Sequence, residues 1–250
     1  MRGVDIFRDH FIGFEDCYVM IGGTACTLLL NDMGEDFRAT KDFDIVLLVE
    51  NIGKEFAEKF WEFIVNGHYQ NSFASQAKGK FYRFEKPEND QYPFMIELFS
   101  REPVNFEIVF GSHLIPLHID DDISSLSAIL LNDDYYKFLQ DGKKMIDGIS
   151  LLDELHLIPF KAKAWCELTD RQLSGEEGLG KHIKKHKKDI VTLLTLITIV
   201  KRITLEGMVL KDMTRFEIGM ESEELTQQTT GIKNMTTQKF CFQLKEIYNL

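Results

Sequence analysis

The sequence predicts an α+β protein, in which a mixed sheet with helices precedes a mainly helical C-terminal domain. Short apolar runs bounded by turn residues fill the first half of the chain. Longer runs with helical periodicity fill the second half. With 44% hydrophobic residues among 250, the chain can bury a sizeable core. We place the boundary near residue 123, so the predicted domains are residues 1–123 and 124–250.

The elements follow from periodicity and from turn residues. Residues 53–65 show the clearest amphipathic helix, with Phe56, Phe60 and Phe63 on one side. Gly111-Ser112 indicates a hairpin, and residues 143–151 are ambiguous between a strand and an irregular segment. Helices are predicted over residues 5–15, 53–65, 124–139, 152–168 and 182–201, and another is predicted to follow Thr24. Strands are predicted over 18–21, 43–49, 81–85, 94–99, 105–110 and 113–118.

A glycine pair lies between the first strand and the second helix. Gly22 and Gly23 have no side chain that would keep a bulky ligand away from the backbone. Thr24 is predicted to cap the helix that follows. A helix start with free N–H groups is a natural phosphate site, although most Gly-Gly pairs are simple turns.

Two aspartates open the next apolar strand. Asp42 and Asp44 are two residues apart, so their carboxylates project from the same face while Phe43 and Ile45 turn towards the core. Carboxylates this close repel one another unless a cation lies between them. Mg²⁺ suits such a site because it binds carboxylate and phosphate oxygens together.

One carboxylate interrupts a later apolar strand. Glu97 lies within FMIELF, where a charge is unfavourable unless it is exposed or paired. Glu107, within FEIVF, is the competing candidate for a third carboxylate. Asp120, Asp121 and Asp122 are interpreted as a solvated turn and a helix cap.

The order strand, Gly-Gly, helix, RATKDFD and apolar strand resembles the nucleotidyltransferase superfamily with its polymerase-beta-like palm, and most of all the AbiEii-type toxin branch. The resemblance implies that residues 1–123 form the palm and that Asp42, Asp44 and Glu97 bind Mg²⁺. It implies a helical domain that closes the active-site cleft. It also implies nucleotide binding by Gly22, Gly23, Thr24, Arg38, Thr40, Lys163 and Lys185.

The same resemblance implies a catalytic lysine on one C-terminal helix and an aspartate on a later one. Lys161 and Asp189 match these positions best, and Lys163 competes with Lys161. Arg171 falls later than the arginine that usually follows this lysine.

Residues 181–188 contain five lysines and two histidines. On a helix, Lys181, Lys184, Lys185 and Lys188 share one face, which could bind a triphosphate or RNA. A solvated helix face is the alternative. His182 and His186 have helical spacing for a metal pair, but no third ligand is evident.

Net charge, cysteine spacing and the length of the apolar segments limit the class of protein. The net charge of −11 argues against a broad basic surface, and the four cysteines show no metal or disulfide pattern. The start of the chain has no signal-peptide pattern and residues 190–200 are too few to span a membrane, so we expect a cytoplasmic protein.

The predicted function is therefore Mg²⁺-dependent transfer of a nucleoside monophosphate from a nucleoside triphosphate to an acceptor hydroxyl. The resemblance implies RNA, such as tRNA, as acceptor and an antitoxin as partner. Two alternatives remain: a nucleotidyltransferase for a small, aminoglycoside-type acceptor, and a non-catalytic nucleotide-binding module.

Overall fold

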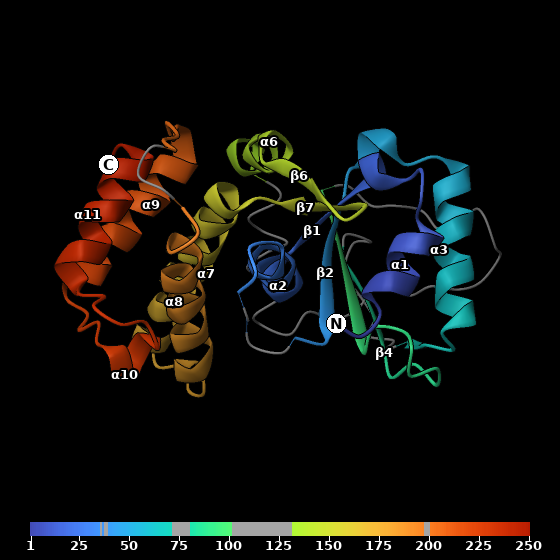
Figure 1. Cartoon of the computed structure of the whole chain (residues 1–250), viewed down its shortest axis with the longest axis horizontal. Coiled ribbons are helices and arrows are strands. Elements are labelled where there is room, and N and C mark those ends of the chain that lie inside the picture. Colours follow the sequence, from blue (N-terminus) through green and yellow to red (C-terminus); the bar gives the residue numbers. More distant parts are fainter. Residues whose placement is uncertain (36, 38–39, 72–80, 102–131, 198–200) are drawn as a thin grey trace. The chain divides into compact units, whose positions relative to one another are not determined.

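A computed structural model describes residues 1–35, 37, 40–71, 81–101, 132–197 and 201–250. The chain forms two compact units, which are described separately here (Figure 1). The first contains residues 1–132 and 143–152, and the second contains residues 133–142 and 153–250. The predicted boundary at residue 123 and the predicted hairpin at 105–118 lie outside the described residues.

A mixed sheet forms the centre of the first unit. Its order is β3-β4-β5-β2-β1-β7-β6. β2 is antiparallel to β1 and parallel to β5, while β4 is antiparallel to β5. The strands are β1 (Tyr18–Ile21), β2 (Asp42–Leu47), β3 (Gln70–Asn71), β4 (Phe81–Glu85), β5 (Met95–Ser100), β6 (Lys143–Ile146) and β7 (Ile149–Leu152).

The sheet carries helices on both faces. The helical segments of this unit are α1 (Val4–His10), η1 (Glu15–Cys17), α2 (Gly22–Asp32), η2 (Val49–Asn51) and α3 (Lys54–Asn66). Figure 1 shows α1 and α3 on one side of β2 and α2 on the other.

An aromatic cluster fills the space between the sheet, α1 and α3. The Phe7 ring lies 5.5 Å from that of Phe43 and 5.7 Å from that of Phe63, and Phe60 packs on Phe84 at 5.7 Å. These rings are buried. Much of the phenylalanine content therefore serves one face of the sheet, where edge-to-face packing stabilises the helices.

The hairpin β6–β7 belongs to the first unit, although it follows the first segment of the second unit in sequence. Its turn residues Asp147 and Gly148 have φ of 46° and 74°, as a two-residue turn of type I′ requires. β7 pairs in parallel with β1 through Leu151 and Met20. The assignment of residues 143–151 to the C-terminal domain was therefore wrong, because the hairpin completes the sheet.

The second unit is helical. It contains α6 (Asp133–Asp141), α7 (Glu154–Leu173), α8 (Gly180–Leu194), α9 (Gly207–Glu221), α10 (Gln227–Thr230) and α11 (Thr237–Tyr248). α7 packs against both α8 and α9. Asp153 caps α7 by accepting the His156 N–H at 2.8 Å. None of the described helices is long and apolar enough to cross a membrane.

A proline lies inside α7, although proline suits the first turn of a helix better than its interior. Pro159 has no N–H for the carbonyl of Leu155, four residues earlier. The hydroxyl of Tyr248, at the end of α11, donates to that carbonyl at 2.8 Å. The C-terminal helix thus supplies the bond that the proline removes, and α7 continues past Pro159.

With a mixed sheet and helices in the first unit and a helical second unit, the predicted α+β class is confirmed.

Candidate functional site

The turn from β1 to α2 brings the backbone onto an aspartate. α2 begins at Gly22, whose φ of +67° lies in the left-handed region. A Cβ atom at this position would lie 1.8 Å from Oδ2 of Asp44. Only glycine can therefore place the start of the helix against this carboxylate.

Thr24 has a different role from the predicted one. Ile21, and not Thr24, is the N-cap of α2, and it forms no side-chain capping bond. The hydroxyl of Thr24 donates to the backbone carbonyl of Asp42 at 2.6 Å. The predicted cap was wrong because the N-cap lies three residues earlier, at Ile21, and the buried threonine instead fixes α2 to β2.

The three predicted carboxylates lie on one face of the sheet. Asp44 pairs with Glu97 in the parallel register of β2 and β5, and Asp42 is two residues from Asp44. Phe43 and Ile45 point to the opposite face and are fully buried. The predicted orientation of the aspartate pair is confirmed. Gly22, Asp44 and Glu97 thus occupy neighbouring positions on β1, β2 and β5.

Glu97 is buried with a positive partner. Arg83, its antiparallel neighbour on β4, approaches Oε1 with Nε at 2.9 Å and with Nη2 at 2.7 Å. The Glu97 residue is 8% exposed. The guanidinium of Arg83 therefore offsets the cost of burying the Glu97 carboxylate. The sequence had led us to assign that role to a metal cation. The rival Glu107 lies outside the described residues.

The carboxylate oxygens on this face are the type of ligand that a hard cation prefers. Carboxylate oxygens are the ligands that Mg²⁺ prefers, and three of them share one face in register. In the described conformation, no three Asp, Glu, His or Cys side chains among the described residues are grouped as metal ligands.

Lys161 and Asp189 form a buried ion pair in the second unit. Nζ of Lys161 donates to Oδ2 of Asp189 at 2.8 Å, between α7 and α8. The two residues are 5% and 1% exposed. The two catalytic candidates predicted on the C-terminal helices are therefore bonded to each other.

Lys163 belongs to another network. Its Nζ lies 3.1 Å from Oδ2 of Asp212 and 3.3 Å from Oε1 of Glu167. The Tyr135 hydroxyl donates to the same Asp212 oxygen at 3.2 Å. Burial acts to lower the pKa of Lys163, but the bond to Asp212 leads the effects that raise it overall. Of the two competing lysines, Lys161 is the one bonded to Asp189.

His186 lies beside the Lys161–Asp189 pair. Its Nδ1 is buried and has no hydrogen-bond partner among the described residues. Burial, and then the charge of Lys161, lowers the pKa of His186 to about 3. The ring is therefore neutral at pH 7. Arg171, the uncertain counterpart of the family arginine, bonds Glu176 at 2.8 Å.

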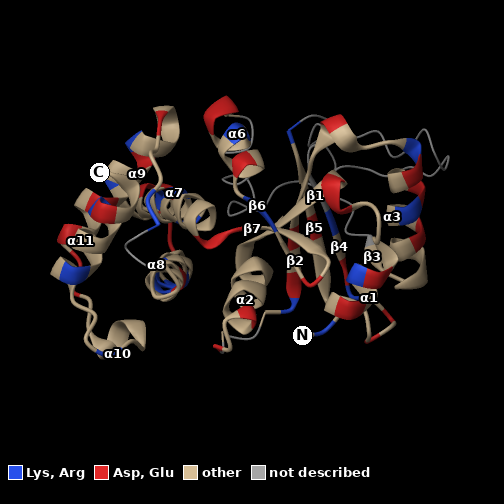
Figure 2. Cartoon of the chain, turned by 45° about the horizontal axis from the view of Figure 1, so that its top comes forward, with Lys and Arg blue, Asp and Glu red and all other residues tan. Residues whose placement is uncertain are grey.

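The lysine face of α8 is exposed, as its spacing predicts. Lys181, Lys184, Lys185 and Lys188 all point to solvent, and within the described part of the chain none of them forms an ion pair. Lys187, on the flank, is paired with Glu223. In Figure 2 the lysines of α8 colour parts of its ribbon blue. In a chain of charge −11, this unneutralised face is a local exception.

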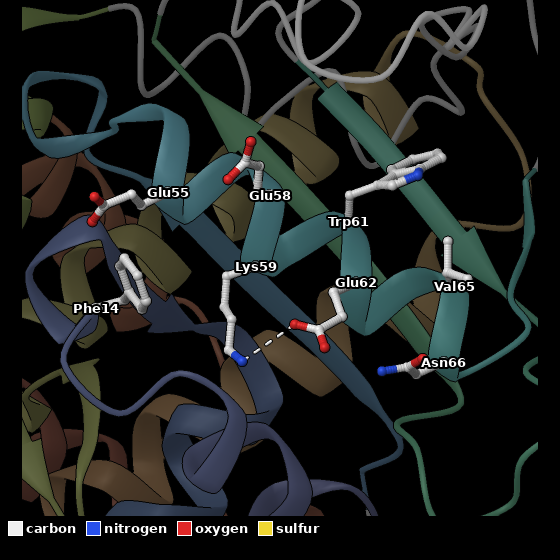
Figure 3. A pocket seen from close by; sticks show the side chains of 8 residues that line it. All are labelled: Phe14, Glu55, Glu58, Lys59, Trp61, Glu62, Val65 and Asn66. Atoms are coloured by element: carbon white, nitrogen blue, oxygen red, sulfur yellow. Dashed lines mark hydrogen bonds and ion pairs between the residues drawn. The ribbon is translucent and has the colours of Figure 1, made fainter.

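The remaining predicted site residues give little information about the geometry of the site. Thr40 lies in the loop before β2, and Arg38 lies outside the described residues. An open hollow of about 580 Å³ lies on the outer side of α3 (Figure 3). Its apolar Trp61 and Val65 stand beside Glu58 and the bonded pair of Lys59 and Glu62, at 3.2 Å. This hollow is separate from the carboxylate face, because α3 covers the aromatic side of the sheet.

Sequence reasoning missed Arg83 and Tyr248. The alternation of β4 contained a signal for Arg83, since a residue next to the buried Phe84 must face the side that carries Glu97. No local pattern signalled the bond of Tyr248 to α7.

Comparison with known proteins identifies no relative: no family model, curated protein or solved structure matches this chain.

Proposed function

We propose that this protein is a Mg²⁺-dependent nucleotidyltransferase with a palm-like first unit. The observation that carries the proposal is the row of Gly22, Asp44 and Glu97 on neighbouring strands, with Asp42 beside it. A helix start, a glycine with no room for a side chain and three carboxylates on one face are together what binding of a cation and a phosphate requires.

Each residue of the row has a proposed role. Asp42 and Asp44, with Glu97, would bind the cation. The N–H groups of Gly22 and Gly23 would bind the nucleotide phosphates, since no side chain caps this helix start. When bound, the cation would increase the acidity of the acceptor hydroxyl and offset charge on the phosphates.

The proposed reaction is a single displacement at phosphorus. The acceptor oxygen forms a bond to the α-phosphorus, the bond between that phosphorus and the bridging oxygen breaks, and pyrophosphate leaves. The acceptor proton passes to solvent. Arg38, Thr40 and Lys161 belong to the proposal through the family resemblance.

RNA is the proposed acceptor, with tRNA as the first to test. The four exposed lysines of α8, which form no ion pair with a described residue, support a polyanionic partner. The AbiEii-like resemblance adds a toxin function, an antitoxin partner and a cytoplasmic location. A small-molecule acceptor would make no use of this face.

The test is incorporation of label from each of the four α-labelled nucleoside triphosphates, with Mg²⁺ and total tRNA. We expect product from the wild type and a loss of at least 100-fold in Asp42→Ala, because the loss of a cation ligand removes several kcal/mol of transition-state stabilisation, about 1.4 kcal/mol for each factor of ten. Asp9→Ala is the matched control. Asp9 is exposed on α1, and α1 covers the opposite face of the sheet.

The same assay identifies the class of acceptor. Product with RNA that is lost in the variant Lys181→Ala/Lys184→Ala/Lys185→Ala/Lys188→Ala supports RNA. Product only with small hydroxyl compounds would replace RNA by that class. If no nucleotide and no acceptor gives product, the alternative of a non-catalytic nucleotide-binding module would remain.

A further inference from the structure

The lysine face of α8 carries positive charge with no acid beside it on the same helix. Its members are Lys181, Lys184, Lys185 and Lys188, all exposed and none in an ion pair with a described residue. The one acidic residue of α8, Asp189, is 1% exposed and bonded to Lys161. Lys187, on the flank, pairs with Glu223, so an acid within reach of this helix is used. The four lysines of the face keep their charge in a chain of net charge −11.

This arrangement of charges weakens the helix that carries it. Lys181 and Lys185 are four residues apart, as are Lys184 and Lys188, and like charges at this spacing repel one another. Lys181 also lies in the first turn of α8, where the positive end of the helix dipole disfavours a cation. A pattern that breaks local rules with no local gain is expected where a residue serves function. A bound polyanion would remove both sources of repulsion.

The turn that ends α10 adjoins the lysine face. α10 packs against α8, and its C-cap is Gly231, with φ of +80°. A Cβ atom at Gly231 would lie 3.9 Å from Cε of Lys188, so the Lys188 side chain passes close to this turn. Lys233, which is exposed, follows Gly231 by two residues. The basic surface of the second unit therefore draws on two elements, α8 and the turn after α10.

The residue types of this surface suit phosphates and not bases. Neither α8 nor the segment 231–234 contains Phe, Tyr, Trp or Arg. Proteins that bind single strands stack the bases on aromatic side chains, and Arg makes the commonest specific contact to a base edge. Lysine binds phosphate as a point charge. The lysines extend over about 10 Å of a rigid helix, which fits the fixed phosphates of a nucleic-acid helix.

We propose that the lysine face binds the phosphate backbone of a helical region of RNA without reading its sequence. Lys233 adds a contact from the turn after α10. The inference rests on the proposed function for the choice of RNA and deepens it, because it names the form of RNA that the protein holds. RNA helices are recognised mostly through shape and through phosphate and 2′-hydroxyl contacts, which require no aromatic platform.

The number of lysines sets the expected dependence on salt. Four phosphate contacts give a slope of about −3.6 for log K against log[salt] on a duplex, and about −2.8 on a single strand. A rise from about 50 to about 200 mM salt should therefore weaken duplex binding about 150-fold. If the two affinities are equal at about 1 M salt, the difference in slope makes the single strand bind about tenfold more weakly at about 50 mM.

The experiment is fluorescence anisotropy of a labelled RNA duplex of about 16 base pairs, with the full chain and without nucleotide or Mg²⁺. We expect two duplexes of unrelated sequence to bind equally, and the single strand to bind about tenfold more weakly. Lys184→Ala/Lys188→Ala should reduce the salt slope by about 2, and Lys233→Ala by about 1. Lys137→Ala/Lys211→Ala is the matched control, because it removes two exposed lysines from α6 and α9 and should leave the slope unchanged.

Circular dichroism verifies that each variant is folded. No duplex binding at about 50 mM salt, or an equal loss in the two double variants, would overturn the inference. Tighter binding of the single strand would also overturn it. Binding to phosphatidylserine vesicles but to neither duplex would replace RNA by a membrane surface.

These outcomes are separate from those of the nucleotide-transfer assay, since binding is measured without nucleotide or Mg²⁺. Duplex binding that depends on Lys184 and Lys188, in a protein that transfers no nucleotide, supports the lysine face and rejects the enzyme. Transfer to RNA with the salt slope unchanged in folded Lys184→Ala/Lys188→Ala rejects the lysine face and leaves the enzyme.

Discussion

The buried pair of Lys161 and Asp189 allows structural and functional roles to be separated. The two charged atoms are 2.8 Å apart and the residues are 5% and 1% exposed. With an effective dielectric constant of about 20, such charges attract by roughly 6 kcal/mol. Removing two ions from water costs several kcal/mol for each, so the pair as a whole contributes little net stability.

Breaking the pair is different, because the charge that remains is still buried but has lost the opposite charge 2.8 Å away. We expect Asp189→Leu to lower the free energy of unfolding by about 3–5 kcal/mol, and Lys161→Met to have a similar effect. The double variant Lys161→Met/Asp189→Leu should recover most of this loss, since no buried charge remains. Lys54 and Glu58, an exposed pair 3.4 Å apart, provide the control, and removing it should change stability by at most about 0.5 kcal/mol.

Urea unfolding followed by circular dichroism measures these values through the midpoint and slope. Single variants that each lose less than about 1 kcal/mol would refute the buried-charge reasoning, as would a double variant that is no more stable than the singles. Nucleotide transfer by the restored double variant then shows whether the pair does more than stabilise the helices.

Three further predictions follow from particular contacts. Gly22→Ala should destabilise the fold by about 2 kcal/mol or more, because it combines positive φ with a Cβ 1.8 Å from Asp44, and an unchanged urea midpoint would contradict this contact. Tyr248→Phe should lower stability by about 1–2 kcal/mol, because it leaves the Leu155 carbonyl without the donor 2.8 Å away, and a neutral result would mean that water replaces the hydroxyl. Burial and a nearby positive charge lower the pKa of His186 from 6.5 to about 3, so the unfolded chain binds a proton that the folded chain does not. Stability should therefore be full above pH 6.5 and fall towards pH 3, by at most about 1.4 kcal/mol per pH unit, and His186→Phe should flatten the curve of stability against pH in this window.

Much of the first unit could be predicted because its strands are short, apolar and sharply bounded. The predicted bounds of β1 and β4 agree with the structure to the residue, and α3 is displaced by one residue. The period of two placed Asp42 and Asp44 on one face. Pairing of the hairpin β6–β7 with β1 could not be predicted, since a contact between Leu151 and Met20 spans most of the chain.

Local competition explains where helix prediction was wrong. α8 was expected to continue to residue 201, but it ends at Leu194. The Thr195 hydroxyl donates to the Thr192 carbonyl at 2.6 Å, and the Leu196 N–H bonds three residues back. Such bonds compete with the helix, and an apolar pattern does not reveal them.

The site was only partly accessible to sequence reasoning. Register across strands brought Glu97 beside Asp44, as expected, but its charged neighbour was an arginine from β4. The choice between Lys161 and Lys163 depended on which face of α7 meets α8. Spacing along one helix does not determine that face, whereas the bond from Lys161 to Asp189 does.

The most direct test of the central claim is a crystal structure with Mn²⁺ and a non-hydrolysable nucleoside triphosphate. The proposal predicts an anomalous peak within about 2–2.5 Å of carboxylate oxygens of Asp42 and Asp44. It also predicts phosphates bound to the N–H groups of Gly22 and Gly23. A metal and nucleotide bound elsewhere, with these carboxylates untouched, would contradict it.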